Sequence, residues 1–356
     1  MVYIGLTNVL FLLRYALAST QGSRRQIYHV VLLALFLFSA FRYQVGCDWF
    51  GYYNQYLIAA NTDWSFLTNS REPLWWATLG SIQDMGLPYP VANIVSSALF
   101  FIGVHMLARR QPDPLGFLIL LFPILVINMP MSAIRQGAAI GLVCIAFAAF
   151  IDRRPIWFAF WVVLAAGFHN SAMVFLLLLP IATGRYTKRR LLMAAVLAIP
   201  GIFFLATSDA GELASTRYID TGREAFGGIF RVGFLGLSAL YFFAFIRKKW
   251  KRSFPQDYSL ASIGAIGMML AFLLIPISSV IGDRLGYYLI PVQTMIFARL
   301  PYLPFRANAA LHCALPYLGL LLVFLVWTQL SRHFQGCYIP YQSWIFGFPN
   351  SFQFGF

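Results

Sequence analysis

The sequence predicts an all-α polytopic membrane protein with about 11–12 membrane segments. Of its 356 residues, 60% are hydrophobic and only 11% are charged, and the mean hydropathy is +0.71. Apolar runs of bilayer-spanning length recur along the chain, whereas a membrane β-barrel would show short alternating segments. A soluble fold could not bury this much apolar surface. We therefore expect one integral membrane domain over residues 1–356.

Each apolar run defines one predicted helix. The helices are expected over residues 2–18, 27–41, 89–108, 115–129, 132–151, 191–207, 230–246, 260–277 and 308–327, with a further one that ends before Arg299. Most of the 26 basic residues fall in alternate turns, such as QGSRRQ and RKKWKR. Because basic residues are retained in the cytoplasm, these turns are predicted on the cytoplasmic side.

Three polar stretches are then predicted on the outer face. They are an outer-face loop at 42–88, which contains an interfacial or re-entrant helix at 73–85, a second loop at 208–228, and a C-terminal tail at 329–356. Most of the 12 acidic residues lie in this outer part, and every lysine lies inside. The net charge of +14 therefore reports membrane orientation and not nucleic-acid binding. Arginine without lysine suggests bidentate recognition of phosphate or carboxylate.

The segment 155–184 has basic clusters at both ends, so both ends are predicted to be cytoplasmic. Two half-helices of about 14 residues would each reach about 21 Å, short of a bilayer of about 30 Å. The segment is thus predicted as a short re-entrant-like hairpin with His169 and Asn170 at its tip. Polar backbone at that depth must face protein or water. The alternative is one long tilted helix with a buried histidine.

The outer stretch Phe41–Pro73 gathers charge and aromatic rings in a chain with little charge. It holds Arg42, Asp48, Arg71 and Glu72. Carboxylates accept sugar hydroxyl protons, Arg binds phosphoryl oxygens, and Trp or Tyr rings stack on sugars. The alternative interpretation is a solvated loop with an aromatic belt at the headgroup level.

Arg135 and Gln136 begin a predicted helix at the outer hydrocarbon edge, where an unpaired charge costs several kcal/mol. This arginine is predicted to bind an anionic substrate, and the alternative is a structural ion pair with an acid such as Asp48 or Asp283. The two roles are compatible with each other.

Other chemistries find little support in the sequence. We see no metal-spaced His/Cys cluster, no phosphate-binding loop and no dinucleotide fingerprint, so no metal and no cofactor are predicted. Cys47 and Cys337 both fall on the predicted outer side, where they could form a disulfide or remain free thiols.

Three motifs in order, FRYQVGCDWFGYYNQY with a following REP, MSAIRQGAAIGLVCIAF, and GFHNSAMVFLLLLP, resemble the EpsG family of Wzy-like exopolysaccharide and O-antigen polymerases. The resemblance is good over about Phe41–Pro180 and loose around Asp283-Arg284 and Arg217-Tyr218. It implies a glycosyltransferase of the type C-like membrane fold. It also implies a multi-pass protein of the bacterial inner membrane with its active site facing the periplasm.

The implied substrates are undecaprenyl-diphosphate-linked oligosaccharide repeat units held in the membrane lipid. The growing glycan would move from one carrier to the non-reducing end of the next unit, and a chain-length regulator protein is a candidate partner. Such a reaction needs a base for the attacking hydroxyl and cations for the diphosphate.

Residues of the predicted outer face are the candidates for the base, for the diphosphate ligands and for the sugar-binding groups. Asp48 is the favoured base and His169 the second candidate, with Glu72 and Asp283 as orienting groups. The expected diphosphate ligands are Arg42, Arg135 and Arg284, supported by Arg71 and Arg217. The expected sugar-binding residues are Trp49, Tyr52, Tyr53, Gln136, Asn170 and Tyr218.

Two other classes stay open at this point. An O-antigen ligase, or another glycosyltransferase that uses lipid-linked sugars, would need the same outer pocket. A lipid-linked oligosaccharide transporter would also place Arg and Asp at membrane depth, although transporters usually show paired repeats and polar groups reachable from both sides.

Overall fold

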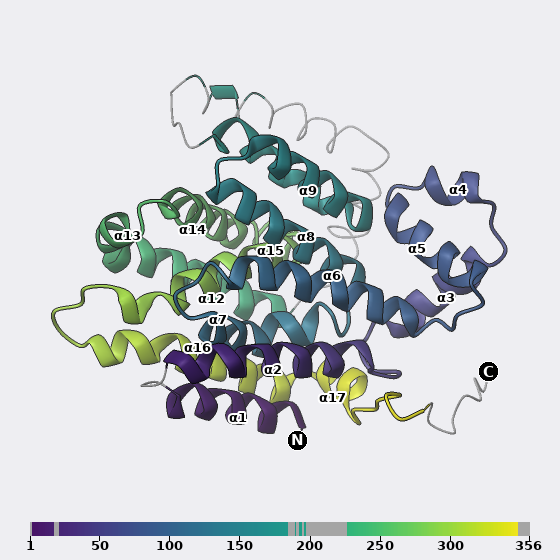
Figure 1. Cartoon of the computed structure of the whole chain (residues 1–356), viewed down its shortest axis with the longest axis horizontal. Helices are drawn as coiled ribbons and strands as arrows, with labels where there is room; N and C mark the ends of the chain where they lie inside the picture. Colours follow the sequence, from purple (N-terminus) through teal and green to yellow (C-terminus); the bar gives the residue numbers. More distant parts are fainter. Residues whose placement is uncertain are drawn as a thin grey trace. The chain divides into compact units, whose positions relative to one another are not determined.

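The computed structural model describes residues 2–17, 21–183 and 226–347, together with the single residues 189, 192, 193 and 196. Figure 1 shows a chain built from helices, and the one β-bridge in its described part is an isolated pair between Arg42 and Ser343. The predicted all-α class is therefore confirmed. The predicted helix 191–207 and most of the second outer loop, including Arg217 and Tyr218, lie outside the described residues.

Among the described residues, four helices are long and apolar enough to cross a membrane: Val91–Ala108, Ile134–Ile151, Gly227–Ser253 and Ala309–Leu330. Shorter apolar helices are Val2–Ala16, Pro114–Val126, Pro155–Phe168, Asn170–Ile181 and Tyr258–Leu273. The protein is thus a multi-pass membrane protein.

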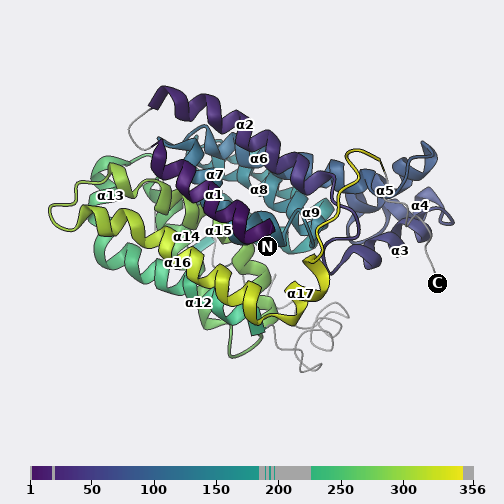
Figure 2. The same cartoon turned by 90° about the horizontal axis from the view of Figure 1, so that it is seen from below.

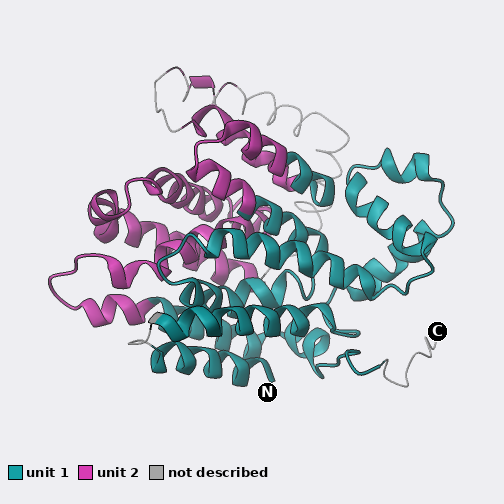
Figure 3. Cartoon of the chain, in the orientation of Figure 1, with its two compact units in different colours: residues 1–144, 163–170, 316–356 teal, residues 145–162, 171–315 magenta. Residues whose placement is uncertain are grey.

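The chain forms two compact units, which Figure 3 colours separately. The first unit comprises Met1–Cys144, Val163–Asn170 and Pro316–Phe356, and the second comprises Ile145–Val162 and Ser171–Leu315.

Within the first unit, α2 packs on α6 and α7, and α1 packs on α7. Figures 1 and 2 show α3, α4 and α5 side by side, at the N-terminal end of α6. The bounds of these helices are α1 Val2–Ala16, α2 Gln21–Ala40, α3 Trp49–Ala59, α4 Trp64–Thr68, α5 Pro73–Asp84, α6 Val91–Ala108 and α7 Pro114–Leu121, which continues as the π-helix Phe122–Val126.

Within the second unit, α12, α14 and α15 pack against one another. The helices are α12 Phe226–Tyr241, a π-helix Phe242–Ile246, α13 Arg247–Ser253, α14 Tyr258–Leu273, α15 Ser279–Ala298 and a short 3-10 turn Leu300–Tyr302. Three helices have residues in both units: α8 Ile134–Ile151, α9 Pro155–Phe168 and α16 Ala309–Leu330. The last helix of the chain, α17 Arg332–Tyr338, belongs to the first unit.

Several predicted boundaries need correction. The turn QGSRRQ is part of α2, and RKKWKR continues the helix that begins with α12. Arg, Lys and Gln are good helix formers, so a basic turn does not have to interrupt a helix. The stretch predicted as a loop with one interfacial helix holds three helices, α3 to α5. The predicted C-terminal tail likewise contains the end of α16 and all of α17.

The predicted break at the GFHN motif is confirmed, because α9 ends at Phe168 and a 3-10 helix begins at Asn170. A single continuous helix over this segment is wrong. The proposal that the two halves form a hairpin that stops inside the membrane stays a prediction.

Candidate active site

The carboxylate of Glu72 joins three of the motifs singled out in the sequence. Glu72 lies at the N-cap position of α5. Its Oε2 accepts a hydrogen bond from Arg135 Nη1, and its Oε1 accepts one from the backbone N–H of Asn170, at 3.2 Å. His169 Nδ1 lies 3.9 Å from the same Oε1. The motifs REP, RQ and HNS therefore meet at one carboxylate.

Arg135 retains hydrogen-bonding capacity beyond this ion pair. Its guanidinium lies over the Tyr52 ring, 5.4 Å from the centroid, and its side chain is 28% exposed. In the described part of the chain, the buried Nε of Arg135 has no hydrogen-bond partner. Because guanidinium carries five N–H donors, the ion pair with Glu72 leaves donors for a second anion.

Two glycine contacts place these motifs beside one another. Gly103 of α6 lies against the backbone of Gly141 in α8, so close that a Cβ on either glycine would collide with the other helix. Small residues at such crossings let membrane helices approach closely. Gly167, near the end of α9, packs on the Leu74 side chain at the start of α5. The first contact fixes α8 against α6, and the second brings the end of α9 to the N-terminus of α5.

The loop before α3 is held against the start of α8. Arg42 Nε donates to the Met131 carbonyl oxygen at 2.7 Å, and Gly46, with φ +103°, lies so close to the same carbonyl that a side chain would not fit. Ser132 Oγ lies 3.4 Å from Asp48 Oδ2. The RYQVGCD motif therefore places the exposed Asp48 beside Ser132, which precedes Arg135 by three residues in the chain.

Arg42 itself is completely buried. Its guanidinium lies 5.5 Å from the centroid of Trp49, and among the described residues its two terminal nitrogens have no hydrogen-bond partner. Burial lowers the pKa of this guanidinium, and the nearby phenol of Tyr89 opposes the shift. In this conformation Arg42 is not open to a substrate, contrary to its expected role as a surface diphosphate ligand.

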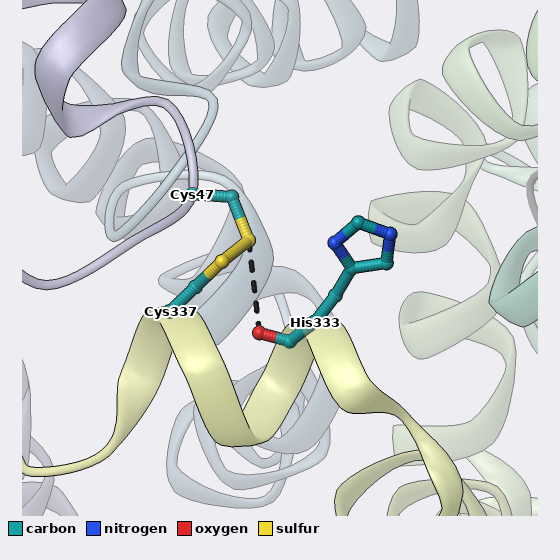
Figure 4. A group of neighbouring side chains, drawn as sticks. All are labelled: Cys47, His333 and Cys337. Carbon is teal, nitrogen blue, oxygen red and sulfur yellow. Dashed lines mark hydrogen bonds between the residues drawn. A yellow bond between two sulfur atoms is a disulfide. The ribbon is translucent and has the colours of Figure 1, made fainter.

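The C-terminal segment braces the same loop. Gly46 N–H donates to the Cys337 carbonyl oxygen at 2.7 Å, and Tyr43 N–H donates to the Gln342 carbonyl oxygen at 2.9 Å. Cys47 and Cys337 form a disulfide, one of the two alternatives that the sequence left open. Figure 4 shows it beside His333, whose carbonyl oxygen lies 3.8 Å from Cys47 Sγ.

These three side chains have metal-ligand types, with ligand atoms within 4.8 Å of one another. Because both sulfurs are bonded to each other, the group lacks the thiolates that a zinc or similar metal would need. We therefore interpret it as a covalent brace for the loop.

The predicted sugar platforms differ in their exposure. Trp49 is 1% exposed and Tyr52 is 6% exposed, and their rings pack against Tyr89 and Trp75 respectively. Neither ring offers an open stacking face. Tyr53 is half-buried. Burial raises the pKa of the Tyr52 phenol, whereas the Arg135 charge lowers it, so Tyr52 is a neutral hydrogen-bonding group beside the arginine.

Asp283 and Arg284 belong to the second unit. Asp283 forms a bidentate pair with Arg231, with distances of 3.0 and 2.7 Å. Arg284 is half-buried near the start of α15. Arg231 was not among the predicted site residues, although it is the one basic residue of an otherwise apolar α12.

Each predicted site residue can now be placed. The structure brings Glu72, Arg135, His169, Asn170 and Tyr52 together, with Asp48 beside Ser132. The predicted alternative was an ion pair of Arg135 with Asp48 or Asp283. Arg135 does form an ion pair, but its partner is Glu72, because the N-cap residue of α5 lies against the start of α8. Arg71, which precedes Glu72 in the sequence, is exposed. Gln136, which follows Arg135, is buried.

Comparisons with known proteins identify the family of this chain. The profile of the EpsG family matches residues 26–343. A curated relative from Ralstonia solanacearum, the "EPS I polysaccharide export inner membrane protein EpsF", is 34% identical over 110 residues, which are 30% of this chain and 26% of that protein. No solved structure matches. Because the family profile spans most of the chain, this protein belongs to the EpsG family and is a membrane protein of polysaccharide biosynthesis.

Proposed function

We propose that this protein is a polysaccharide polymerase. It transfers a glycan from an undecaprenyl-diphosphate carrier to the non-reducing end of a second lipid-linked repeat unit. The observation that carries the proposal is the junction at Glu72, where an arginine with spare donors, a histidine and a carboxylate meet. These are the groups that glycosyl transfer from a diphosphate requires.

In this reaction the oxygen of a sugar hydroxyl forms a bond to the anomeric carbon of the donor. The bond between that carbon and the diphosphate oxygen breaks, and the diphosphate leaves with the electron pair. The hydroxyl proton passes to a base on the protein. The protein must therefore place one base and one cationic group on opposite sides of the same carbon.

The geometry favours His169 as the base and Glu72 as its orienting group. His169 Nδ1 lies 3.9 Å from Glu72 Oε1, which is beyond hydrogen-bond distance, so the carboxylate favours a protonated imidazole through its charge. Asp48 remains the second candidate, because it is exposed and held by Ser132 near the start of α8. Glu72 lies beside His169 and Ser132 lies beside Asp48, so substitutions of each residue can show which of the two is the base.

Arg135 is the proposed diphosphate ligand, and arginine charge rather than a metal balances the leaving group. Arg284, Arg71 and Arg217 are proposed as further cationic groups. Arg42 we reassign to a positioning role, because its guanidinium is buried between Trp49 and the Met131 carbonyl. Trp49 and Tyr52 likewise support the site from within the α3–α5 core.

The proposed cellular location follows from the proposed lipid-linked substrate. The protein lies in the bacterial inner membrane with the Glu72 cluster on the periplasmic side, where an oxidising environment suits the Cys47–Cys337 disulfide. A chain-length regulator protein is a proposed partner.

The decisive experiment uses the purified protein in nanodiscs with undecaprenyl-diphosphate-linked repeat units, excess chelator and no nucleotide sugar. We expect a ladder of products on a gel. Arg135→Ala should abolish the ladder, whereas Arg332→Ala, a matched change of an exposed arginine on α17, should retain it. A folded and fully active Arg135→Ala protein would overturn the assignment.

The same assay distinguishes two other activities. Consumption of the lipid-linked unit only after lipid A or another acceptor is added would identify a ligase. The relative from Ralstonia is named as an export protein, which makes transport a second candidate. A unit that crosses a sealed membrane without being consumed would identify a transporter.

A further inference from the structure

A pocket lies within the α3–α5 region, away from Glu72. It has a volume of about 250 Å³. It is lined by the end of α3, the turn that follows, α4 and the C-terminal half of α5. Its polar lining is formed by Thr62, Asp63, Trp64, Gln83 and Asp84.

The ring of Trp64 is fixed at this pocket and yet open to it. Trp64 is 43% exposed, and its Nε1 donates to Asp84 Oδ2 at 3.0 Å. The ring lies over Gly80 of α5, where an added Cβ would come within 3.3 Å of it. The absence of a side chain at Gly80 therefore lets the edge of the indole approach α5, where the hydrogen bond to Asp84 holds it.

The chemistry of the lining selects a class of ligand. An oriented indole offers a face for the apolar side of a sugar ring, and the adjacent carboxylates and amide hydrogen-bond hydroxyl groups. The side chain of Asp63 makes no capping hydrogen bond to α4. No Lys or Arg lines the pocket, which makes a diphosphate an unsuitable ligand.

Resting on the proposed polymerase function, we propose that this pocket is a subsite for one sugar ring of the lipid-linked glycan, distant from the reacting bond. Its volume is below the range of about 300–1,000 Å³ found for drug-sized ligands, so it suits a single ring. Glu72 occupies the N-cap position of α5, and Asp84 is the last residue of the helix. The 12 residues of α5 span about 18 Å.

This separation means that a short oligosaccharide, and not one sugar, connects the two sites. The pocket would then select the repeat unit by a sugar that takes no part in the chemistry. Binding there would hold the glycan in register while its diphosphate-linked sugar lies at the Glu72 cluster.

The first test measures binding without catalysis. The probe is the free repeat-unit oligosaccharide, released by mild acid from the host's own lipid-linked precursor, and saturation-transfer NMR follows its binding to the protein in nanodiscs. Trp64→Leu should weaken binding by roughly three- to tenfold, the worth of one ring contact. Trp157→Leu removes another half-exposed indole, 53% exposed on α9, and should leave binding unchanged.

A second variant guards against misfolding of α4. Asp63→Asn keeps the shape of an exposed side chain and should raise KM for the full lipid-linked unit by roughly three- to tenfold, with kcat nearly constant. With a lipid-linked donor that carries only the reducing-end sugar, the same variant should behave like the wild type. An equal defect with both donors would overturn a distal subsite.

These outcomes separate the two proposals. If the wild-type protein binds the free oligosaccharide through Trp64 but makes no polymer, the subsite stands and the polymerase proposal fails. If polymer forms and neither variant changes binding or KM, the subsite alone fails. Loss of oligosaccharide binding in excess chelator would instead identify a cation held by Asp63 and Asp84, and would overturn direct recognition of the sugar.

Discussion

Two arginine–carboxylate pairs in this protein each lie beside a tyrosine ring but differ in their hydrogen bonding and exposure. Arg135 pairs with Glu72 and lies over Tyr52, and Arg231 pairs with Asp283 and lies over Tyr287 at 5.2 Å. In the second pair, two guanidinium nitrogens bind both carboxylate oxygens. In the first, one nitrogen binds one oxygen, and the other oxygen accepts from the Asn170 backbone and faces His169.

The two pairs differ in how many of their hydrogen-bonding groups already have partners within the pair and in how exposed the arginine is. The Arg231–Asp283 pair joins two packed helices of one unit and has both oxygens satisfied by one partner. The Arg135–Glu72 pair is shared among three chain segments, and its arginine is more exposed, at 28% against 12%. A saturated pair stabilises a helix contact, whereas a shared and partly open pair can exchange a partner for substrate.

The largest effect should come from breaking the saturated pair. Arg231→Met leaves the Asp283 carboxylate without its cation, and we expect the free energy of unfolding to fall by about 3–5 kcal/mol, as for other buried pairs. Turnover per folded molecule should change less than about twofold. Thermal unfolding in detergent, followed by fluorescence, measures the loss. The double variant Arg231→Met/Asp283→Leu should recover most of the stability, because no unpaired charge remains.

The matched change at the shared pair should act on turnover. Arg135→Met is expected to reduce kcat by about 10²–10³-fold, the usual effect of removing a group that stabilises transition-state charge. Its unfolding temperature should fall less than that of Arg231→Met. If the two variants lost stability equally and activity equally, the comparison between the pairs would be wrong.

His169→Asn tests the proposed base in the shared cluster. We expect about a 100-fold loss of kcat, within the usual range for general-base catalysis. The acid limb of the pH–rate profile should also disappear, because no titrating base remains, while Asp48→Asn should keep that limb. The opposite result, with the limb lost only in Asp48→Asn, would assign the base to Asp48.

The disulfide brace should have a smaller effect. Cys47→Ser/Cys337→Ser removes the covalent link across a sequence separation of 290 residues and should cost about 2 kcal/mol of stability. The backbone hydrogen bonds of Gly46 and Tyr43 to the C-terminal segment remain to hold the loop. Ellman titration and thermal unfolding would check this, and Cys144→Ser, at a buried free cysteine, tests whether loss of any cysteine has the same effect.

The smallest effect is expected at the contact that positions Asp48. Ser132→Ala removes one hydrogen bond of 3.4 Å, a change of about 1 kcal/mol. We expect KM to rise by roughly threefold to fivefold with kcat nearly unchanged. A loss of kcat as large as that of His169→Asn would mean that Asp48, held by Ser132, takes part directly in the reaction.

Much of the fold was predictable because it depends on local properties. Apolar runs and basic turns predict where helices lie and which ends face the cytoplasm, and the helix break at His169 followed from charge and length. The helical turns at QGSRRQ and RKKWKR were not predictable in this way, because good helix formers in a basic turn are compatible with both helix and loop. The candidate residues themselves were also found from the sequence, as polar groups in an apolar chain.

By itself, the sequence determined the class of protein, most of the apolar helices and a short set of chemically suited residues, since hydropathy and residue type act locally. The tertiary structure alone decided which of those residues meet. The partner of Arg135 is Glu72, 63 residues away, and the backbone that completes the cluster is 98 residues from Glu72. Burial of Arg42 and Trp49 was likewise decided there. Such contacts depend on which helix ends pack together, through glycine crossings such as Gly103 on Gly141, and no local pattern encodes that choice.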